Sequence, residues 1–299
     1  MSTSTLLPML LTSTPQLPCG EQWAYEVKWD GVRSLCVVVP GEKVRLISRR
    51  GLNHTERYHE LQGMRDLLET PCVLDGEIVA LTPSGKPDFA RVLRRERSTI
   101  TTEGTGGDAI HYMVFDLLEH DGISLLDWPW SKRRARLQTL LPQSGLLQWS
   151  ADHTDGDVLW KATKDLGLEG VVAKLRTSTY LPGQRSHEWR KARHLQVTQA
   201  LVWGVVVFEG RPRSLLLAMR QDPALYIGRV GSGVPQHLLA ALQAMTDTLV
   251  DRVAFSVPAP ARGERYAFLV DPVVIEVRFA EWTATGTLRQ PVFLRLITE

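Results

Sequence analysis

The pattern of apolar and polar positions divides the chain into two parts with different textures. In the first part, apolar runs bounded by turn residues predict strands at Tyr25–Lys28, Arg33–Val39, Val44–Ser48, Cys72–Leu81, His111–Leu118 and Gly170–Leu175. Apolar residues at helical spacing predict helices at Thr55–Leu68, Asp88–Arg97 and Asp155–Leu166, and a basic amphipathic helix that begins near Ser131. The glycine-rich segment Thr101–Asp108 is predicted to be a loop.

The texture changes near residues 194–198. From Ala200 onward, short β-rich segments broken by turns predict strands at Leu201–Phe208, Ser214–Arg220, Leu225–Val230 and Val273–Phe279, with one helix from Val234 to about Leu249. Short strands at this spacing are typical of a small barrel or sandwich. We therefore predict two domains, residues 1–196 and residues 197–299.

Composition is that of a globular protein, with 43% hydrophobic and 23% charged residues in 299. A net charge of +2 neither requires nor excludes nucleic acid. The cysteines Cys19, Cys36 and Cys72 are far apart and form no C-x-x-C pair, which argues against a zinc finger or a disulfide framework. No apolar stretch approaches the roughly 18 residues of a membrane span, and the run Leu6–Leu11 follows no basic segment, so we interpret it as an extended lead-in. These features predict a cytoplasmic protein with no membrane partner.

Lys28 is the first candidate for chemistry. A free lysine has a pKa of roughly 10.4 and is a poor nucleophile until burial or nearby cations destabilise its ammonium. A single lysine at a strand end is more often solvated, but two carboxylates, Glu77 and Glu169, lie in or beside apolar strands, and charged residues are seldom buried unless paired or bound to a metal. Lys174 is five positions after Glu169, so regular alternation places the two on opposite strand faces, and a bend would be needed to bring both to one site.

Several basic residues are candidates for phosphate contact. Lys191 and Arg193 are two apart and share a face of a predicted strand, either as solvated cations or as contacts to nucleotide phosphates. The chain has no G-x-x-x-x-G-K-S/T loop, so side chains and a metal would have to neutralise a nucleotide. Further candidates for contact with DNA phosphates, each cluster alone being more often a solvated face, are Arg91, Arg94, Arg95 and Arg97, then Lys132, Arg133, Arg134 and Arg136, then Arg185, His187 and Arg190.

Six segments resemble, in order, the signature motifs of covalent nucleotidyltransferases. They are Lys28-Trp29-Asp30-Gly31-Val32-Arg33 (K-x-D-G-x-R), Ser48-Arg49-Arg50-Gly51, Asp75-Gly76-Glu77, Tyr112-Met113-Val114-Phe115-Asp116, Glu169-Gly170-Val171-Val172-Ala173-Lys174 and Trp189-Arg190-Lys191-Ala192-Arg193. The second half continues the resemblance at 226–233, 277–283 and 288–293. The chain is similar to ATP-dependent DNA ligases, and most similar to the bacterial end-joining ligase domain. This resemblance implies an α+β fold, with an adenylyltransferase domain of antiparallel sheets and flanking helices followed by a C-terminal OB-fold β-barrel.

The resemblance also implies a role for each matching residue. Lys28 would attack the α-phosphorus of ATP and carry AMP. The other implied roles are adenine contacts for Glu26 and Phe115, ribose contacts for Arg33 and Glu77, metal binding for Glu169 and Glu77, phosphate contacts for Lys174, Lys191 and Arg193, contact with the 5′-phosphate of a nick for Arg49, and orientation of pyrophosphate for Arg289 and Arg295. The sequence departs from the family at Arg193, where lysine is frequent, and after Arg295, where an acidic residue is frequent.

By this resemblance the protein seals 5′-phosphate/3′-hydroxyl nicks in duplex DNA through a lysyl-AMP intermediate, in DNA repair or end joining. ATP and Mg²⁺ or Mn²⁺ are the expected cofactors, because oxygen ligands such as Glu169 suit these metals. The expected partners are nicked duplex DNA, Ku and other end-joining proteins, and we expect a monomer associated with the nucleoid in a bacterial cytoplasm. Residues 194–199 are predicted to act as a hinge. The alternatives are an RNA ligase or capping-type guanylyltransferase, which share K-x-D-G, and a catalytically weak nucleotide-dependent DNA-binding module.

Overall fold

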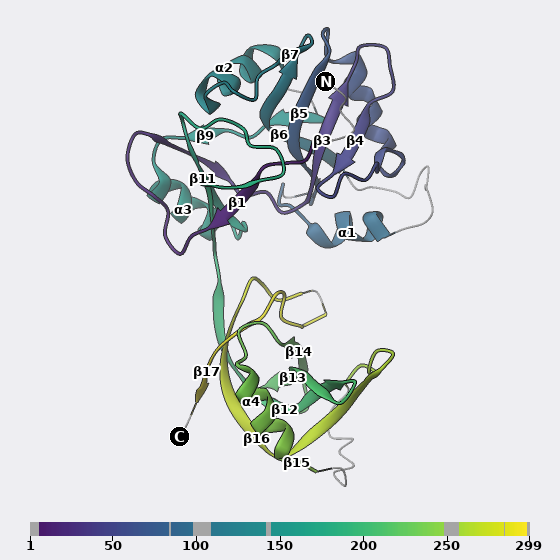
Figure 1. Ribbon diagram of the computed structural model, residues 1–299, viewed down its shortest axis with the longest axis vertical. Coiled ribbons are helices and arrows are strands. Elements are labelled where there is room, and N and C mark those ends of the chain that lie inside the picture. Colours follow the sequence, from purple (N-terminus) through teal and green to yellow (C-terminus); the bar gives the residue numbers. More distant parts are fainter. Residues whose placement is uncertain are drawn as a thin grey trace. The chain divides into compact units, whose positions relative to one another are not determined.

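The computed structural model describes residues 6–83, 85–97, 109–141, 145–247, 257–283 and 285–297. The chain forms two compact units, Met1–Arg193 (unit 1) and His194–Glu299 (unit 2) (Figure 1). The predicted loop Thr101–Asp108 lies outside the described residues. None of the helices in the described part of the chain combines the length and the apolar character needed to cross a membrane.

The first sheet of unit 1, sheet A, brings the N-terminal segment beside the end of the unit. Its strand order is β1 (Leu10–Ser13), β11 (Arg185–Arg193), β10 (Gly170–Leu175), β2 (Trp23–Val27) and β9 (Asp152–His153), and only β1 pairs in parallel. α3 (Gly156–Asp165) covers one face, where its Leu159 packs with Trp23, Tyr25 and Val171. Because side chains alternate along β2, Ala24 and Glu26 point to the opposite face.

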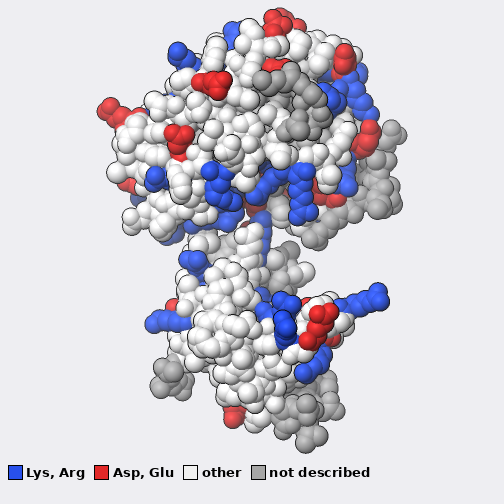
Figure 2. Space-filling view, in the orientation of Figure 1, with Lys and Arg blue, Asp and Glu red and all other residues white. Residues whose placement is uncertain are grey.

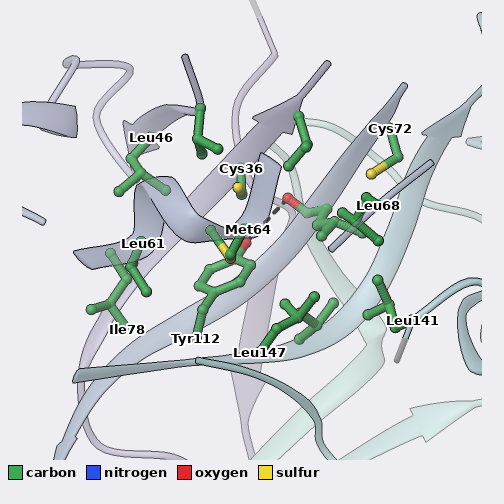
Figure 3. Packing of buried hydrophobic residues seen from close by; sticks show 14 of the residues in the cluster. Cys36, Leu46, Leu61, Met64, Leu68, Cys72, Ile78, Tyr112, Leu141 and Leu147 are labelled. Atoms are coloured by element: carbon green, nitrogen blue, oxygen red, sulfur yellow. Dashed lines mark hydrogen bonds between the residues drawn. The ribbon is translucent and has the colours of Figure 1, made fainter. Parts of the chain in front are cut away.

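The second sheet of unit 1, sheet B, carries the largest core. Its strand order is β4 (Arg45–Ser48), β3 (Val32–Val38), β5 (Cys72–Leu81), β6 (Ala109–His120) and β7 (Ile123–Ser124), and β8 (Leu147–Trp149) pairs in parallel with β6. Leu61 and Met64 of η3 (His59–Asp66) pack in this core with Ile78 and Tyr112 (Figure 3). The core also takes Val92 from α1 (Phe89–Arg97) and Leu137 from α2 (Trp130–Leu140).

A third apolar cluster lies between the two sheets. It joins Ala24 and Trp189 of sheet A to Leu35, Val37 and Val73 of sheet B. The polar members of the same inward faces line a pocket described below, so the packing of sheet A on sheet B positions the candidate site.

Unit 2 is a curled antiparallel sheet closed by one helix. The strand order is β14 (Tyr226–Val230), β13 (Arg211–Met219), β12 (Gln196–Phe208), β16 (Glu264–Phe279) and β15 (Thr246–Asp247), with β17 (Val292–Ile297) paired to β16. The register of β12 against β16 shifts between Val202 and Gly204, and a Cβ at Gly204 would lie 2.5 Å from the Ala267 carbonyl oxygen. This close approach lets the long strands curl around a core that α4 (Gln236–Ala244) closes with Leu239 and Leu242. The predicted α+β fold is confirmed.

Three element predictions differ from the structure. The predicted helix Thr55–Leu68 consists of two 3₁₀ segments, η2 (Thr55–Arg57) and η3, because Tyr58 between them has φ −133° and ψ 58°. The apolar N-terminal run is not a lead-in but contributes β1 and the fully buried Met9. The predicted helix from Val234 ends at Ala244, and its last two residues, 248 and 249, lie outside the described residues.

Candidate functional site

A pocket with an empty volume of about 410 Å³ lies in unit 1 where the inward faces of the two sheets meet. Sheet A and the turn after β2 supply most of its wall, and sheet B supplies the rest. Its lining residues are Leu11, Glu26, Val27, Lys28, Trp29, Arg33, Glu77, Phe115, Val172, Lys174 and Trp189. Six of the predicted site residues therefore share one pocket.

Lys28 directly follows β2, and Trp29 separates it from the Asp30-Gly31 turn. Its Nζ is 2.5 Å from Glu169 Oε2, and the Nε of Arg193 is 2.7 Å from Glu169 Oε1. The Lys28 side chain is 16% exposed and that of Glu169 14%. One half-buried carboxylate thus holds two cations, and Lys28 remains accessible from the pocket.

Gly170 provides the bend that is needed to bring Glu169 and Lys174 to the same site. Its φ is +152°, and a Cβ there would lie 2.1 Å from the Ala192 carbonyl oxygen, so β10 and β11 approach closely at this point. The Lys28 amide donates to the Gly170 carbonyl oxygen at 3.0 Å. This bend lets Glu169 reach Lys28 while Lys174, on the same strand, reaches the pocket.

Lys174 lines the same pocket and lies between aromatic rings. Its Nζ is 2.9 and 3.0 Å from the two carboxylate oxygens of Glu26, and it donates to the Phe115 carbonyl oxygen at 3.2 Å. The ammonium lies 4.4 Å from the ring centre of Trp189 and 4.5 Å from that of Phe115. Burial raises the pKa of Glu26 and lowers the pKa of Lys174, although their mutual attraction opposes both shifts. Lys174 therefore contacts Glu26 and Phe115, the two residues predicted to contact adenine.

Arg33, on β3, lines the pocket. It donates to the fully buried carboxylate of Asp75 from Nε at 3.0 Å and from Nη2 at 2.6 Å, and it lies 5.2 Å from the ring centre of Phe115. Glu77 is its partner across the β3–β5 ladder. Burial raises the pKa of Glu77 to about 7, opposed by the charges of Lys28 and Arg33.

Lys191 extends the positive charge along β11. Burial, with the neighbouring charges of Arg193 and Lys28, lowers the pKa of Lys191 to about 8. Arg49 acts in the same direction from the exposed turn after β4, where the Gly51 amide donates to the Ser48 carbonyl oxygen at 2.8 Å. Cations predicted to contact phosphate are thus close enough to repel one another.

The second-domain candidates belong to unit 2. Arg289 Nη1 lies 2.5 Å from Glu281 Oε1, and Arg295 Nε lies 2.9 Å from Glu276 Oε2. Each is engaged within unit 2, and their role at pyrophosphate remains a prediction.

Two of the basic residues predicted as DNA contacts are structural. Arg133 is fully buried and donates to both carboxylate oxygens of Asp116 at 2.8 Å, and the nearly buried Arg134 pairs with Asp152 at 3.0 Å. The expectation that they form a DNA surface is wrong, since neither reaches solvent. Other Lys and Arg side chains form a band on the face of unit 1 seen in Figure 2.

A divalent cation fits the donor set at the Lys28 end of the pocket. Within the described residues no three acidic, His or Cys side chains form a ready-made metal cluster. Mg²⁺, however, is usually bound by one or two carboxylates together with substrate phosphates. Glu169 and Glu77 supply such a pair, and they are close enough that the charge of Glu169 helps to raise the pKa of Glu77.

Comparison with known proteins agrees with this geometry. The family model described as "ATP dependent DNA ligase domain" matches residues 8–193, and "ATP dependent DNA ligase C terminal region" matches residues 209–298. This chain belongs to the ATP-dependent DNA ligase family.

Two relatives in the family are longer than this chain. "Multifunctional non-homologous end joining DNA repair protein LigD" of Mycobacterium tuberculosis is 37% identical over 294 residues, which are 95% of this chain and 37% of that protein. A DNA ligase of Methanoculleus marisnigri is 33% identical, over 95% of this chain and 53% of that protein. The solved structure of "mycobacterial DNA ligase D complexed with ATP and MES" is 34% identical, with a TM-score of 0.61, and covers 99% of this chain and 96% of that one. The chain thus spans about a third to a half of the length of the Mycobacterium tuberculosis and Methanoculleus marisnigri proteins.

Sequence reasoning missed several residues of this ligase-family pocket. Trp29 and Trp189 lie within the recognised motifs and line the pocket, and Trp29 Nε1 donates to Ser150 Oγ at 3.0 Å. Leu11 lines the pocket from β1, and the only sequence signal for it was the apolar N-terminal run. Asp75, within Asp75-Gly76-Glu77, was named as part of a motif without a role of its own.

Proposed function

We propose that this chain is an ATP-dependent DNA ligase that seals 5′-phosphate/3′-hydroxyl nicks in duplex DNA through AMP attached to Lys28. The observation that carries the proposal is the position of Lys28 Nζ, 2.5 Å from Glu169 and on the wall of the pocket that also holds Glu26, Arg33 and Phe115. Membership of the ligase family supports it.

In the first step the lone pair of Lys28 Nζ attacks the α-phosphorus of ATP. A phosphorus–nitrogen bond forms, the bond from the α-phosphorus to the bridging oxygen breaks, and pyrophosphate leaves with that oxygen. The Lys28 ammonium first gives a proton to Glu169, which already accepts a hydrogen bond from it, and this frees the lone pair. The second proton leaves to solvent as the phosphorus–nitrogen bond forms. Lys191 and Arg193 supply fixed positive charge, and such transfers need little beyond positioning and charge stabilisation.

Within this proposal Glu26 and Phe115 bind adenine, and Arg33 and Glu77 bind ribose. Lys174, which contacts Glu26 and the Phe115 carbonyl oxygen, neutralises phosphate charge. Glu169 and Glu77 would hold Mg²⁺ or Mn²⁺, and such a cation supplies charge neutralisation at the phosphates when bound.

In the later steps the chain acts on DNA. The 5′-phosphate of the nick, held by Arg49, displaces Lys28 from AMP, so the phosphorus–nitrogen bond breaks and an adenylylated DNA end forms. The 3′-hydroxyl then attacks the DNA phosphate and AMP leaves.

We extend the proposal to a domain division near residue 196, with a hinge at 194–199, and to roles for Arg289 and Arg295 in the first step. We also propose a place in end-joining repair, which the name of the Mycobacterium tuberculosis relative supports.

The test is formation of the covalent adduct. Wild-type protein incubated with ATP labelled at the α-phosphate and Mg²⁺ should retain covalently bound label after denaturing gel electrophoresis. Lys28→Ala should lose it, while Lys43→Ala, an exposed lysine paired with Glu56, should keep it. Label that survives in Lys28→Ala would refute the mechanism.

The choice of substrates separates the alternatives. A DNA ligase should use ATP in preference to GTP and seal nicked DNA in preference to nicked RNA. The opposite nucleotide preference would favour a capping-type enzyme, and the opposite nick preference an RNA ligase. Adduct formation without sealing in a single turnover would favour the DNA-binding module.

A further inference from the structure

The carboxylate that holds Arg33 has a second partner. Asp75 is completely buried and accepts two hydrogen bonds from Arg33, and its Oδ2 also accepts one from the Tyr180 hydroxyl at 2.6 Å. Tyr180 is 2% exposed. Three donors thus satisfy a carboxylate that water cannot reach, and the direction of the Arg33 guanidinium depends on where Asp75 is fixed.

Tyr180 is itself fixed by the N-terminal segment. The Met9 amide donates to the Tyr180 hydroxyl at 2.9 Å, so the phenol oxygen accepts from the backbone on one side and donates to Asp75 on the other. The loop that carries Tyr180 is held to the same segment, because the Gly183 amide donates to Leu7 at 3.0 Å and the Leu10 amide donates to Gln184 at 2.7 Å. The Tyr180 ring packs edge-on against Trp189, with centroids 5.6 Å apart.

These contacts form one continuous chain of hydrogen bonds from the N-terminal segment to the pocket. It runs from the Met9 amide through Tyr180 and Asp75 to Arg33, and two residues beyond Met9 the side chain of Leu11 lines the pocket itself. We propose that Tyr180 is a positioning residue that sets Arg33 against the ribose of the nucleotide, and that the segment 7–13 completes this pocket. The inference rests on the proposed function, which places Arg33 at the ribose.

A purely structural role for Tyr180 makes a different prediction. Tyr180 also belongs to the apolar cluster between the sheets, so its loss could act through packing alone. Tyr180→Phe keeps the ring and removes only the oxygen. Tyr58→Phe is the matched control, since Tyr58 is equally buried and also donates to a carboxylate at 2.6 Å, that of Glu96, but Tyr58 is not among the residues that line the pocket.

The experiment compares ATP with its 2′-deoxy and 3′-deoxy analogues in adduct formation by the full chain. Because a hydrogen bond to a charged group contributes about a factor of ten or more, Tyr180→Phe should raise the KM for ATP about tenfold. Wild type should use one or both deoxy analogues less well than ATP. In Tyr180→Phe this preference for ATP should fall by a similar factor. The maximal rate should stay within about twofold of wild type, because the contacts of Lys28 with Glu169 are untouched. Tyr58→Phe should match wild type in KM and in preference.

A double-mutant cycle shows whether Tyr180 acts through Arg33. Arg33→Ala alone should lose the ribose preference, and adding Tyr180→Phe should change it no further. The inference would be overturned by additive losses in the double mutant, by an unchanged preference in Tyr180→Phe, or by a wild type without ribose preference. In each of these cases adduct formation by wild type would still uphold the proposed function. Failure of wild type to form the adduct would overturn the proposed function and the inference with it. If Tyr180→Phe does not fold, Met9→Pro, which removes the amide donor, is measured in its place with the same expected results.

Discussion

Glu169 holds two cations, Lys28 at 2.5 Å and Arg193 at 2.7 Å, while the nearby Lys191 has no carboxylate of its own among the described contacts. This uneven pairing bears on the pKa of Lys191. Burial, together with the neighbouring charges of Arg193 and Lys28, lowers the pKa of Lys191 to about 8. The charge of Lys191 therefore changes close to neutral pH.

We predict that affinity for ATP weakens as the pH rises through about 8. The pKa of Lys191 is lowered, so its ammonium is present below pH 8 and is lost above it, and phosphate attraction is lost with it. The KM for ATP in adduct formation, measured from pH 7 to pH 9, should rise several-fold.

Lys191→Arg separates this effect from other titrations. A guanidinium keeps its charge throughout this range, so the variant should show a flatter KM profile than wild type. Superimposable profiles of wild type and Lys191→Arg would rule Lys191 out as the titrating group.

Sequence reasoning named most of the pocket but could not assign every partner. Lys28, Glu77 and Phe115 follow from short motifs whose residues are adjacent in the chain. The resemblance implies phosphate contact for Lys174, yet its carboxylate partner Glu26 comes from a strand 148 residues earlier in the chain, and its aromatic contacts Phe115 and Trp189 come from two further strands. Such pairings depend on strand order, which the sequence pattern does not encode.

At the scale of elements, the approach of β10 to β11 depends on Gly170. We predict that Gly170→Ala lowers the rate of adduct formation at least about tenfold and destabilises unit 1. A Cβ at 2.1 Å from the Ala192 oxygen forces the strands apart, and the backbone strain alone costs roughly 1–3 kcal/mol. Thermal unfolding and single-turnover adduct formation measure the two effects.

Gly145→Ala is the control, because a Cβ there meets nothing within 4 Å. It should leave both measurements close to wild type. A Gly170→Ala variant with normal stability and a normal rate would show that the bend at residue 170 is not needed to place Glu169.

α2 is anchored by a buried charge where the sequence suggested a DNA-binding face. We predict that Arg133→Met destabilises unit 1 by about 3–5 kcal/mol, because Asp116 would remain buried without its cation. Lys132→Met, on the exposed side of the same helix, should change stability by no more than about 0.5 kcal/mol. Urea unfolding gives both values, and equal effects would mean that the Arg133–Asp116 pair contributes no more than a surface charge.

The η3 segment shows how an element can be misread from a sound pattern. Tyr58, Leu61, Met64 and Leu67 recur every three residues and all contact the sheet B core. A spacing of three fits the 3.0 residues per turn of a 3₁₀ helix better than the 3.6 of an α-helix. The strands were easier to predict, since their turns are marked by glycine and by Asp-Gly pairs.

At the scale of the whole molecule, the chain contains separate cores. The largest cluster of unit 1 and the cluster of unit 2 share no residue, and the pocket is lined by unit 1 residues alone. Units with their own cores can unfold independently. Ligand binding should then stabilise one core and leave the other unchanged.

We predict two thermal transitions, of which a non-hydrolysable ATP analogue raises only one. Ligand at about 100 times its Kd adds about 2.7 kcal/mol to the unit it binds, which corresponds to a rise of roughly 5–10 °C for a unit of this size. Differential scanning calorimetry measures both transitions, and Arg133→Met identifies the unit 1 transition by lowering it alone. Arg33→Ala, which removes a lining cation, should reduce the ligand-induced rise. A single transition, or equal shifts of both, would mean that the two cores unfold as one and that nucleotide binding at unit 1 is coupled to unit 2.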